Sequence, residues 1–310
     1  MGIIKVQDVE YVTFSAPDLA RMREFLSDFG MTDSDQSDRG VLRMRGSGEA
    51  PFIHKTILGT AGFVGLALRA RSVEDLETLA KSQGLAVNDL PAPEQGRVVS
   101  LTDPNGFRID VVAGLKRVTR APLPPKTGWN TTENRSRPNV PKRVASGPSS
   151  VLRIGHVVLG VNDVAESWKW WSERFGLLMS DEVRAPNGAM AAVFIRCDRD
   201  SEPADHHSLN FAQMPGKRAA FHHAAFEVAD LDDLMVGHEL LKERGYTHSW
   251  GIGRHILGSQ VFDYWRDPWG HLIEHWTDGD VFAADVPASV TDIPTMLGRQ
   301  WGPPAPADFV

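Results

Sequence analysis

The sequence predicts an α+β fold in which four βαβββ modules are paired into two domains. Short runs of alternating apolar and polar residues mark the strands, and the helices between them begin at capping residues and end at glycines. The same order of elements then occurs a second time further along the chain. A long internal repeat of this kind is a strong indication of fold, so the two halves are expected to share one architecture.

The first half of the chain, residues 1–115, is expected to hold two modules. The predicted elements are a strand at 8–13, a helix at 19–29, strands at 41–45, 53–57 and 65–69, a helix at 72–83, and a hairpin with strands at 97–102 and 107–112. Gly30 and Gly84 end the two helices. The Asp-Pro-Asn-Gly sequence at 103–106 predicts the turn of the hairpin.

The second half, residues 150–285, repeats this order. The predicted elements are a strand at 155–160, a helix at 164–175, strands at 190–196, 208–213 and 223–228, a helix at 230–244, and a hairpin within 264–276. Segment 63–68 aligns with 221–226, and the turn at 103–106 aligns with the turn at 267–270. The second half is therefore expected to form a second pair of modules.

Two segments lie outside the predicted domains. Residues 116–149 are rich in Pro, Arg, Lys, Asn and Ser, which is typical of an extended linker, and their positive charges are expected to form a solvated face. Residues 286–310 are rich in Pro and Ala and are expected to form a tail on the surface or against a neighbouring subunit.

Composition excludes several classes of function. The formal net charge is −7, which argues against a protein that binds the phosphate backbone of nucleic acid. No apolar run is long enough to span a bilayer, and no secretory signal is recognised, so we expect no membrane partner. The single cysteine, Cys197, cannot form an intramolecular disulfide and fits a reducing cytoplasm, where we expect the protein to be located.

Glu274 is the first candidate for a functional residue. The strand that returns from the predicted hairpin places Leu272, Glu274 and Trp276 on one face, so the carboxylate is expected to point towards an apolar interior. A buried carboxylate must be neutralised, paired or bound to a metal. The alternative is a carboxylate at a strand end that faces water or an arginine, and this stretch alone leaves both interpretations open.

Two histidines are candidates for functional residues in the same domain as Glu274. His156 lies on the first strand of one module and His223 on the first strand of the next. The matching positions in the first half hold Tyr11, Gly65 and Asp110. Two histidines and one carboxylate on rigid strands form the facial triad that holds non-haem Fe(II) and leaves positions open for other ligands.

Each histidine also has a simpler interpretation, because a lone histidine on a strand is more often a core or surface group than a metal ligand. His222 and His223 are adjacent and should face opposite ways on a strand. We select His223 because it is the residue that aligns with His156.

Three further residues are candidates for catalysis. His207 opens a predicted strand and should share the phase of Leu209 and Phe211, His255 is expected in a loop before the hairpin, and Tyr264 lies on the hairpin. A neutral histidine can accept a phenol proton and return it, and a tyrosine can donate a hydrogen bond to a metal-bound oxygen. The alternative is that His206 and His207 are only polar loop residues and Tyr264 only a core residue.

This set of residues resembles the type I extradiol ring-cleavage dioxygenases of the vicinal oxygen chelate superfamily, whose fold is glyoxalase-like. The resemblance covers nearly the whole chain, and its most specific part is Gly253-Arg254-His255 with Tyr264, Asp267-Pro268, Gly270 and Glu274. It implies that His156, His223 and Glu274 are the Fe(II) ligands. It also implies that His207 is an acid/base residue and that His255 and Tyr264 hydrogen-bond the substrate hydroxyl and the reacting oxygens.

The resemblance implies extradiol (meta) cleavage of a catechol-type aromatic, substituted or hydroxylated, with O₂ as co-substrate, in the degradation of aromatic compounds. Segment 251–276 resembles most the enzymes for trihydroxytoluene and chlorohydroquinone, and Ile256-Leu257-Gly258 argues against biphenyl diol. Mn(II) is an alternative to Fe(II). The partner is then a small aromatic diol, and the family favours a homo-oligomer.

Two other functions stay open on the sequence alone. One is a different metalloenzyme on the same fold, such as an isomerase or a hydroquinone-cleaving enzyme. The other is a non-catalytic ligand-binding protein of the bleomycin-resistance type, which would not need His156, His223 and Glu274 together.

Overall fold

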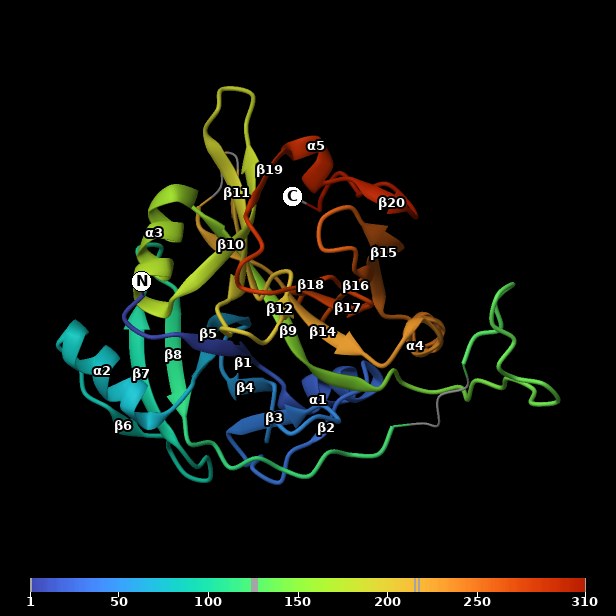
Figure 1. Cartoon of the computed structure of the whole chain (residues 1–310). Coiled ribbons are helices and arrows are strands. Elements are labelled where there is room, and N and C mark those ends of the chain that lie inside the picture. The colour runs from blue at the N-terminus through green and yellow to red at the C-terminus, as the bar shows by residue number, and fades with distance from the viewer. Residues whose placement is uncertain (1, 124–127, 215, 217, 310) are drawn as a thin grey trace.

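The computed structural model describes residues 2–123, 128–214, 216 and 218–309. It contains an 8-stranded sheet built from the first half of the chain and a 10-stranded sheet built from the second half (Figure 1). Both sheets are mixed, and helices cover their faces. The predicted fold class, an α+β glyoxalase-like fold with two sheets that form two domains, is confirmed.

The first domain has the predicted order of elements. Its helices and strands are β1 (Val6–Ala16), α1 (Leu19–Asp28), β2 (Thr32–Asp33), β3 (Val41–Arg45), β4 (His54–Leu58), β5 (Gly62–Ala70), α2 (Val73–Gln83), β6 (Asn88–Asp89), β7 (Arg97–Thr102) and β8 (Arg108–Ala113). The side chain of Asp18 caps α1, Ser72 caps α2, and Gly84 ends α2 in the left-handed conformation. The short strands β2 and β6 were not predicted.

The second domain repeats this order and adds elements at its end. Its helices and strands are β9 (Val151–Val161), α3 (Val164–Phe175), β10 (Leu177–Arg184), β11 (Met190–Cys197), β12 (Ala204–Asp205), β13 (Leu209–Gln213), β14 (Ala220–Val228), α4 (Leu231–Glu243), β15 (Thr247–His255), β16 (Val261–Arg266), β17 (Leu272–Thr277), β18 (Val281–Phe282), β19 (Ser289–Asp292), α5 (Ile293–Met296) and β20 (Arg299–Trp301). Strands β10 and β15 were not predicted.

Each sheet joins two modules through their first strands. The strand order is β2-β3-β4-β1-β5-β8-β7-β6 in the first sheet, and β10-β11-β13-β9-β14-β17-β16-β15 forms the matching part of the second. The register supports the alignment of the two halves. His156 and Glu274 are both partners of Ala225 on β14, and Tyr11 and Asp110 hold the same two places beside β5.

The first domain has no room for a copy of the site that the second domain holds. Gly65 aligns with His223, but a Cβ atom at Gly65 would lie 2.4 Å from the carbonyl oxygen of Arg108. The ring of Tyr11, which aligns with His156, packs on Phe52 with 4.8 Å between centroids. The buried side chains that fill this interior are Tyr11, Phe52, Ala67, Leu90, Val98 and Val112.

The two domains meet at β17. His275 donates a hydrogen bond from Nε2 to the carbonyl oxygen of Phe29 at 2.7 Å, and its ring stacks on Phe29 with 3.6 Å between centroids. A second contact joins the domains nearby, because the hydroxyl of Tyr246 donates to Asp28 at 2.9 Å. One face of β17 is therefore packed against the first domain.

The connector and the tail differ in structure. Residues 116–149 form no helix or strand in the part of the connector that the structure describes, and residues 124–127 lie outside it; the connector, green in Figure 1, runs past the first domain and loops outwards. The tail instead extends the second sheet at both edges, since β19 pairs with β10 and β20 pairs with β15.

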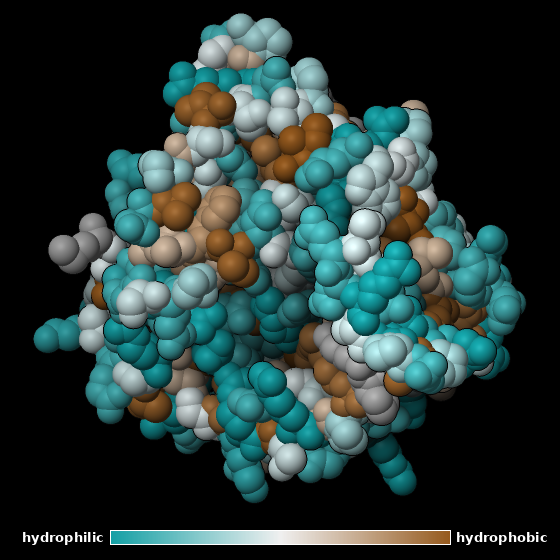
Figure 2. Space-filling view, turned by 45° about the vertical axis from the view of Figure 1, so that its right-hand side comes forward, coloured by the Kyte–Doolittle hydropathy of each residue, from teal (hydrophilic) through white to brown (hydrophobic). Residues whose placement is uncertain are grey.

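The outer surface is mixed in character. On the face shown in Figure 2, hydrophobic residues form small separate groups among hydrophilic ones. Within the described ranges, no helix is both long and apolar enough to cross a membrane.

Candidate metal centre

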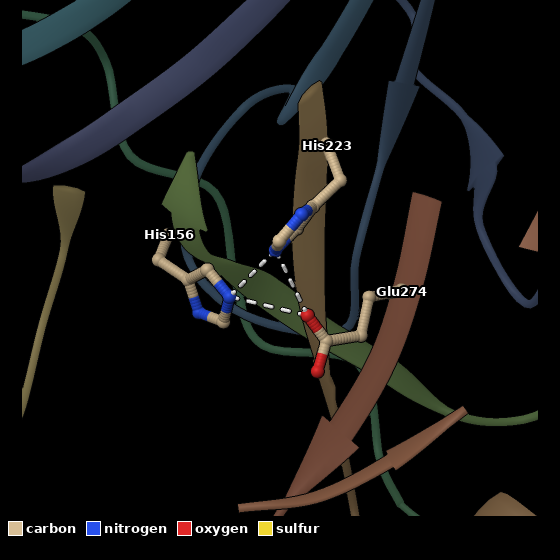
Figure 3. Close-up of side chains that lie close together, drawn as sticks. All are labelled: His156, His223 and Glu274. Atoms are coloured by element: carbon tan, nitrogen blue, oxygen red, sulfur yellow. Dashed lines mark hydrogen bonds and ion pairs between the residues drawn. The ribbon is translucent and has the colours of Figure 1, made fainter. Parts of the chain in front are cut away.

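Three neighbouring strands of the second sheet bring His156, His223 and Glu274 together (Figure 3). The Nε2 atoms of both histidines face Oε2 of Glu274, at 3.1 Å from His156 and 3.3 Å from His223. The two Nε2 atoms lie 3.4 Å apart. All three side chains are buried, and Glu274 is 0% exposed. The fully buried Glu274 excludes the interpretation as a strand-end carboxylate that faces water.

The donor set fits a divalent metal ion. Ligand atoms at about 2.1 Å from one ion and at right angles to each other lie about 3 Å apart, close to the spacing found here. Oε1 of Glu274 and Nδ1 of His156 have no hydrogen-bond partner among the described residues. Burial by itself would raise the pKa of Glu274, but the two histidines outweigh it and hold that pKa well below its usual value. The carboxylate is therefore charged and can bind a cation.

His223 is held in the tautomer that a metal ligand needs. The carbonyl oxygen of Phe309 can only accept, so His222 donates to it from Nε2 at 2.7 Å. Nδ1 of His222 must then accept a hydrogen bond from Nδ1 of His223, and these two atoms lie 2.7 Å apart. The lone pair of His223 consequently lies on Nε2, which faces His156 and Glu274.

The prediction that His222 and His223 face opposite ways is wrong. Both side chains line the same cavity. The physical reason is a register shift between Phe221 and His223 in the pairing of β14 with β9, which interrupts the alternation of the strand. The selection of His223 over His222 for the cluster nevertheless agrees with the geometry.

His207 lies beside the cluster at the end of a chain of hydrogen bonds. Its ring is 4.2 Å from the ring of His156, between centroids. Asp181 accepts from Nε2 of His206 at 2.6 Å, so Nδ1 of His206 accepts from Nδ1 of His207 at 3.0 Å. Nε2 of His207 then carries a lone pair. Burial is the main cause that lowers the pKa of His207 well below its usual value, and this keeps the ring neutral.

The expected strand phase of His207 is wrong. Leu209 and Phe211 point into the hydrophobic core, whereas His207 lines the cavity with Asn210 and Ala212. His207 precedes β13, whose first residue is Leu209, so strand alternation does not extend to it. The hydrogen bonds by which Asp181 and His206 support His207 were not predicted. Asp181 lies on β10, which has a register shift next to this residue, and the sequence of β10 does not alternate strictly.

His255 and Tyr264 form a hydrogen-bonded pair on the other side of the cavity. Nε2 of His255 lies 2.9 Å from the hydroxyl of Tyr264. His255 is the last residue of β15 and not part of a loop, which corrects the prediction. Burial lowers the pKa of His255 to about 4 and raises that of Tyr264 well above its usual value, so both side chains are neutral near pH 7.

The cavity over the cluster has a volume of about 80 Å³. The tail closes one side of it, because Phe309, Met296 and Leu297 belong to its lining. Phe309 packs on Trp250 with 4.6 Å between centroids. The composition of the tail gave no indication that it contributes to the site.

Cys197 takes no part in this arrangement. Its side chain is buried, and burial raises its pKa to about 12. A thiol with this pKa stays protonated near pH 7, so Cys197 is a core residue and not a nucleophile.

Comparison with known proteins agrees with this geometry. Residues 153–275 match the Glyoxalase/Bleomycin resistance protein/Dioxygenase superfamily. Metapyrocatechase 2 of Cupriavidus necator is 28% identical, over 98% of this chain and 92% of its own length. An iron-dependent extradiol dioxygenase of Rhodococcus jostii is 21% identical, over 89% of this chain and 90% of its own length.

Solved structures show the same fold. Homoprotocatechuate 2,3-dioxygenase of Brevibacterium fuscum, in complex with 3,4-dihydroxyphenylacetate, has a TM-score of 0.79 at 18% identity and covers 99% of this chain and 92% of its own. The Mn(II)-bound glyoxalase of Novosphingobium aromaticivorans has a TM-score of 0.78 at 21% identity and covers 98% of this chain and 93% of its own.

These findings confirm the resemblance to type I extradiol dioxygenases of the glyoxalase superfamily. They also agree with the predicted enzyme class and with the predicted metal, since one relative is named as an iron-dependent extradiol dioxygenase and the chain has a His/His/Glu cluster suited to a metal ion.

Proposed function

We propose that this chain, which has the fold and the His/His/Glu triad of the extradiol dioxygenases, opens the ring of a catechol-type aromatic next to its diol and incorporates both atoms of O₂. The observation that carries the proposal is the position of the triad. His156 and His223 line a cavity together with His207, His255 and Tyr264, and the fully buried Glu274 lies against the two histidines. A glyoxalase-like isomerase or a binding protein would not need all three of these side chains around one metal.

His156, His223 and Glu274 would hold Fe(II), with Mn(II) as the alternative. The bound metal would supply adjacent positions for the diol and O₂ and a path for electron density between them. The triad brings one negative charge to a doubly charged ion, so a substrate bound as a monoanion completes the neutralisation.

His207 would move the substrate proton. Its ring is neutral, and its Nε2 lone pair is available in the cavity because Nδ1–H is committed to His206. A hydroxyl of the substrate can therefore pass a proton to Nε2, and the same atom can return it when the ring opens. Positioned acid/base groups of this kind contribute about 10²- to 10⁴-fold to the rate.

His255 and Tyr264 would orient the diol from the opposite side. Both are neutral and can exchange their mutual hydrogen bond for bonds to oxygens of the substrate. The aromatic walls formed by Trp250 and Phe309 would exclude water, which strengthens each of these polar interactions.

The lining of the cavity supports a substrate without charged substituents. Among the described residues, it contains no lysine or arginine that could bind a carboxylate on the ring. Leu257, two residues after the motif residue His255, presents an apolar surface instead. We therefore propose a substituted or hydroxylated catechol, of the kind that trihydroxytoluene represents; a chlorohydroquinone, whose hydroxyls are not adjacent, is the alternative.

The rest of the proposal concerns organisation. We propose a first domain at 1–115 without a metal site, a connector at 116–149, a catalytic domain at 150–285 and a tail at 286–310. The end of the first sheet at Ala113 and the start of the second at Val151 support the connector, whereas the tail adds β19 and β20 to the second sheet. A cytoplasmic location and a homo-oligomer are also proposals; the buried, free thiol of Cys197 is compatible with a reducing compartment.

The test is anaerobic reconstitution with Fe(II), followed by addition of a diol and then of air. The panel contains 3-methylcatechol, hydroxyquinol, trihydroxytoluene, chlorohydroquinone, 2,3-dihydroxybiphenyl and 3,4-dihydroxyphenylacetate, and His223→Ala is the control. We expect O₂ uptake and a yellow ring-opened product with an uncharged diol, and neither with the control. A protein that binds Fe(II) but consumes no O₂ with any diol would refute the proposed reaction.

A further inference from the structure

A second cluster of potential metal ligands lies outside the catalytic cavity. It consists of His238 on α4, His248 on β15 and Asp263 on β16, and their donor atoms all lie within 4.8 Å of one another. Nε2 of His248 lies 2.8 Å from Oδ1 of Asp263, and Nδ1 of His238 lies 3.1 Å from its Oδ2 and 3.2 Å from its Oδ1. Three separate elements of the fold therefore converge on one carboxylate.

The cluster lies on the face of β16 that points away from the cavity. Tyr264 lines the cavity, whereas its neighbours Asp263 and Trp265 point to the opposite side, where α4 packs. Strand alternation explains this separation. A ligand bound at Asp263 would not be part of the metal centre in Figure 3.

Asp263 is a buried charge that needs compensation. It is 0% exposed, and no lysine or arginine among the described residues forms an ion pair with it. The partners of its carboxylate among the described residues are the two histidines and the indole of Trp265, which donates to Oδ2 at 2.6 Å. Trp265 thus fixes one oxygen of the carboxylate and leaves Oδ1 directed at the histidines. Metal-ligating carboxylates are commonly held by such an additional hydrogen bond.

The spacing of the donors suits a tetrahedral site. Ligands at about 2.0–2.1 Å from a Zn²⁺ ion lie about 3.3 Å apart, so small shifts of side chains would place all three around one ion. The side chains of His238 and His248 are 14% and 32% exposed, which leaves a path from solvent and a place for a water molecule as fourth ligand.

We propose that His238, His248 and Asp263 form a second divalent-cation site, of the kind that takes Zn²⁺, which joins α4 to the hairpin of β15 and β16. This hairpin carries His255 and Tyr264, so the ion would stabilise one wall of the catalytic cavity without contacting the substrate. The proposal is independent of the reaction that the catalytic centre performs.

The competing occupant of the cluster is a proton. The hydrogen bond to Asp263 raises the pKa of His238, and a protonated imidazole could compensate the carboxylate without any metal. The two arrangements differ in stoichiometry, because only one of them adds a metal ion to the one at His156, His223 and Glu274.

The test is metal binding by the full-length chain, stripped of metal and titrated with Co(II) and with Zn²⁺. We expect two equivalents for the wild type, and one equivalent for His223→Ala with the intense visible absorption of tetrahedral Co(II). The variants Asp263→Asn and His248→Gln should each keep the catalytic equivalent and lose the other. His271→Gln is the matched control, since His271 pairs with Asp267 at 2.7 Å and belongs to neither cluster.

Thermal unfolding gives a second readout. Zn²⁺ at about one hundred times its dissociation constant should raise the Tm of His223→Ala by roughly 5–10 °C, and should leave the double variant His223→Ala/His248→Gln unchanged. One equivalent for the wild type, or an equal Tm shift in the double variant, would overturn the proposal in favour of a protonated His238. If Asp263→Asn does not fold, His248→Gln, whose side chain is partly exposed, still decides between the two.

Discussion

Replacing Tyr264 by Phe removes a single hydroxyl from the cavity and leaves the ring where it is. The ring is held by Trp250, Phe309 and His223, at 5.6, 5.0 and 5.2 Å between centroids. The hydroxyl contacts Nε2 of His255 at 2.9 Å and is not one of the three groups that face the proposed metal position. The change therefore removes the polar contacts of one hydroxyl, which are the hydrogen bond to His255 and an interaction with Glu274, and leaves the rest of the cavity in place.

The size of the effect follows from the charge of the group that Tyr264 would contact. A hydrogen bond to a charged oxygen contributes about 1.5–3 kcal/mol, which corresponds to a decrease of about 10- to 150-fold in kcat/KM. Loss of the neutral bond to His255 should lower the free energy of unfolding by only about 1 kcal/mol. The iron content should stay at the wild-type value.

The assay is the initial rate of ring-opened product in air-saturated buffer, with iron measured in the same samples. Tyr11→Phe is a suitable control, because Tyr11 is buried in the first domain and its hydroxyl has no hydrogen-bond partner among the described residues. Its loss should change neither activity nor iron. A Tyr264→Phe variant with full kcat/KM, or one that loses its iron, would refute the role assigned to the hydroxyl.

Four other substitutions and a change of pH have defined outcomes. His207→Ala should keep iron and lower kcat by about 10²- to 10⁴-fold, measured as product formation with iron content. His223→Ala should bind no iron, whereas His222→Phe should weaken iron binding by about 10- to 100-fold, measured by titration. Asp181→Asn should lower kcat with unchanged iron, because a neutral amide replaces the charged acceptor of His206 and weakens the hydrogen bonds that position His207. Acid should destabilise the fold through His54, because burial lowers the pKa of this histidine to about 3 in the folded state. The unfolded state therefore takes up a proton first, and the free energy of unfolding falls by up to about 1.4 kcal/mol per pH unit below pH 6.5. Urea unfolding at pH 7 and at pH 5 measures this change.

Each of these expectations can fail in a distinct way. Loss of iron from His207→Ala would place His207 among the ligands, and loss from His222→Phe but not from His223→Ala would reverse the assignment of the two. An Asp181→Asn variant with wild-type kcat would show that the hydrogen-bond chain does not position His207. A His54→Phe variant whose stability falls with acid as steeply as that of the wild type would exclude His54 as the cause.

The fold could be predicted because its signals are local and repeated. Asp18, Ser72 and Asp163 precede their helices and accept backbone N–H groups from the first turn, as the sequence indicates. Gly84 and Gly176 end two helices in the left-handed conformation. The repeat then aligns distant segments without any knowledge of their contacts, and this is how His156, His223 and Glu274 could be grouped.

The errors arise where the backbone departs from regular alternation. The register shift between Phe221 and His223 makes the adjacent side chains of His222 and His223 face the same cavity, and the sequence does not indicate this shift. Gly251 and Gly253 favour a loop in the sequence of β15, yet this segment is a strand that pairs with β16 on one side and with β20 on the other. His238, His248 and Asp263 come from three elements, so only the folded chain brings them together.

The contact between His275 and Phe29 limits how this protein could be dissected or redesigned. The Glu274 carboxylate faces His156 and His223, and the next residue, His275, contacts the first domain through a ring stack and a hydrogen bond. An excised second half would lose this contact directly beside Glu274, a proposed metal ligand. It would also expose to water the face of β17 that is buried against the first domain. No cluster of metal ligands is found among the described residues of the first domain, yet its contact with His275 supports the second half, so we expect the second half to be less stable on its own.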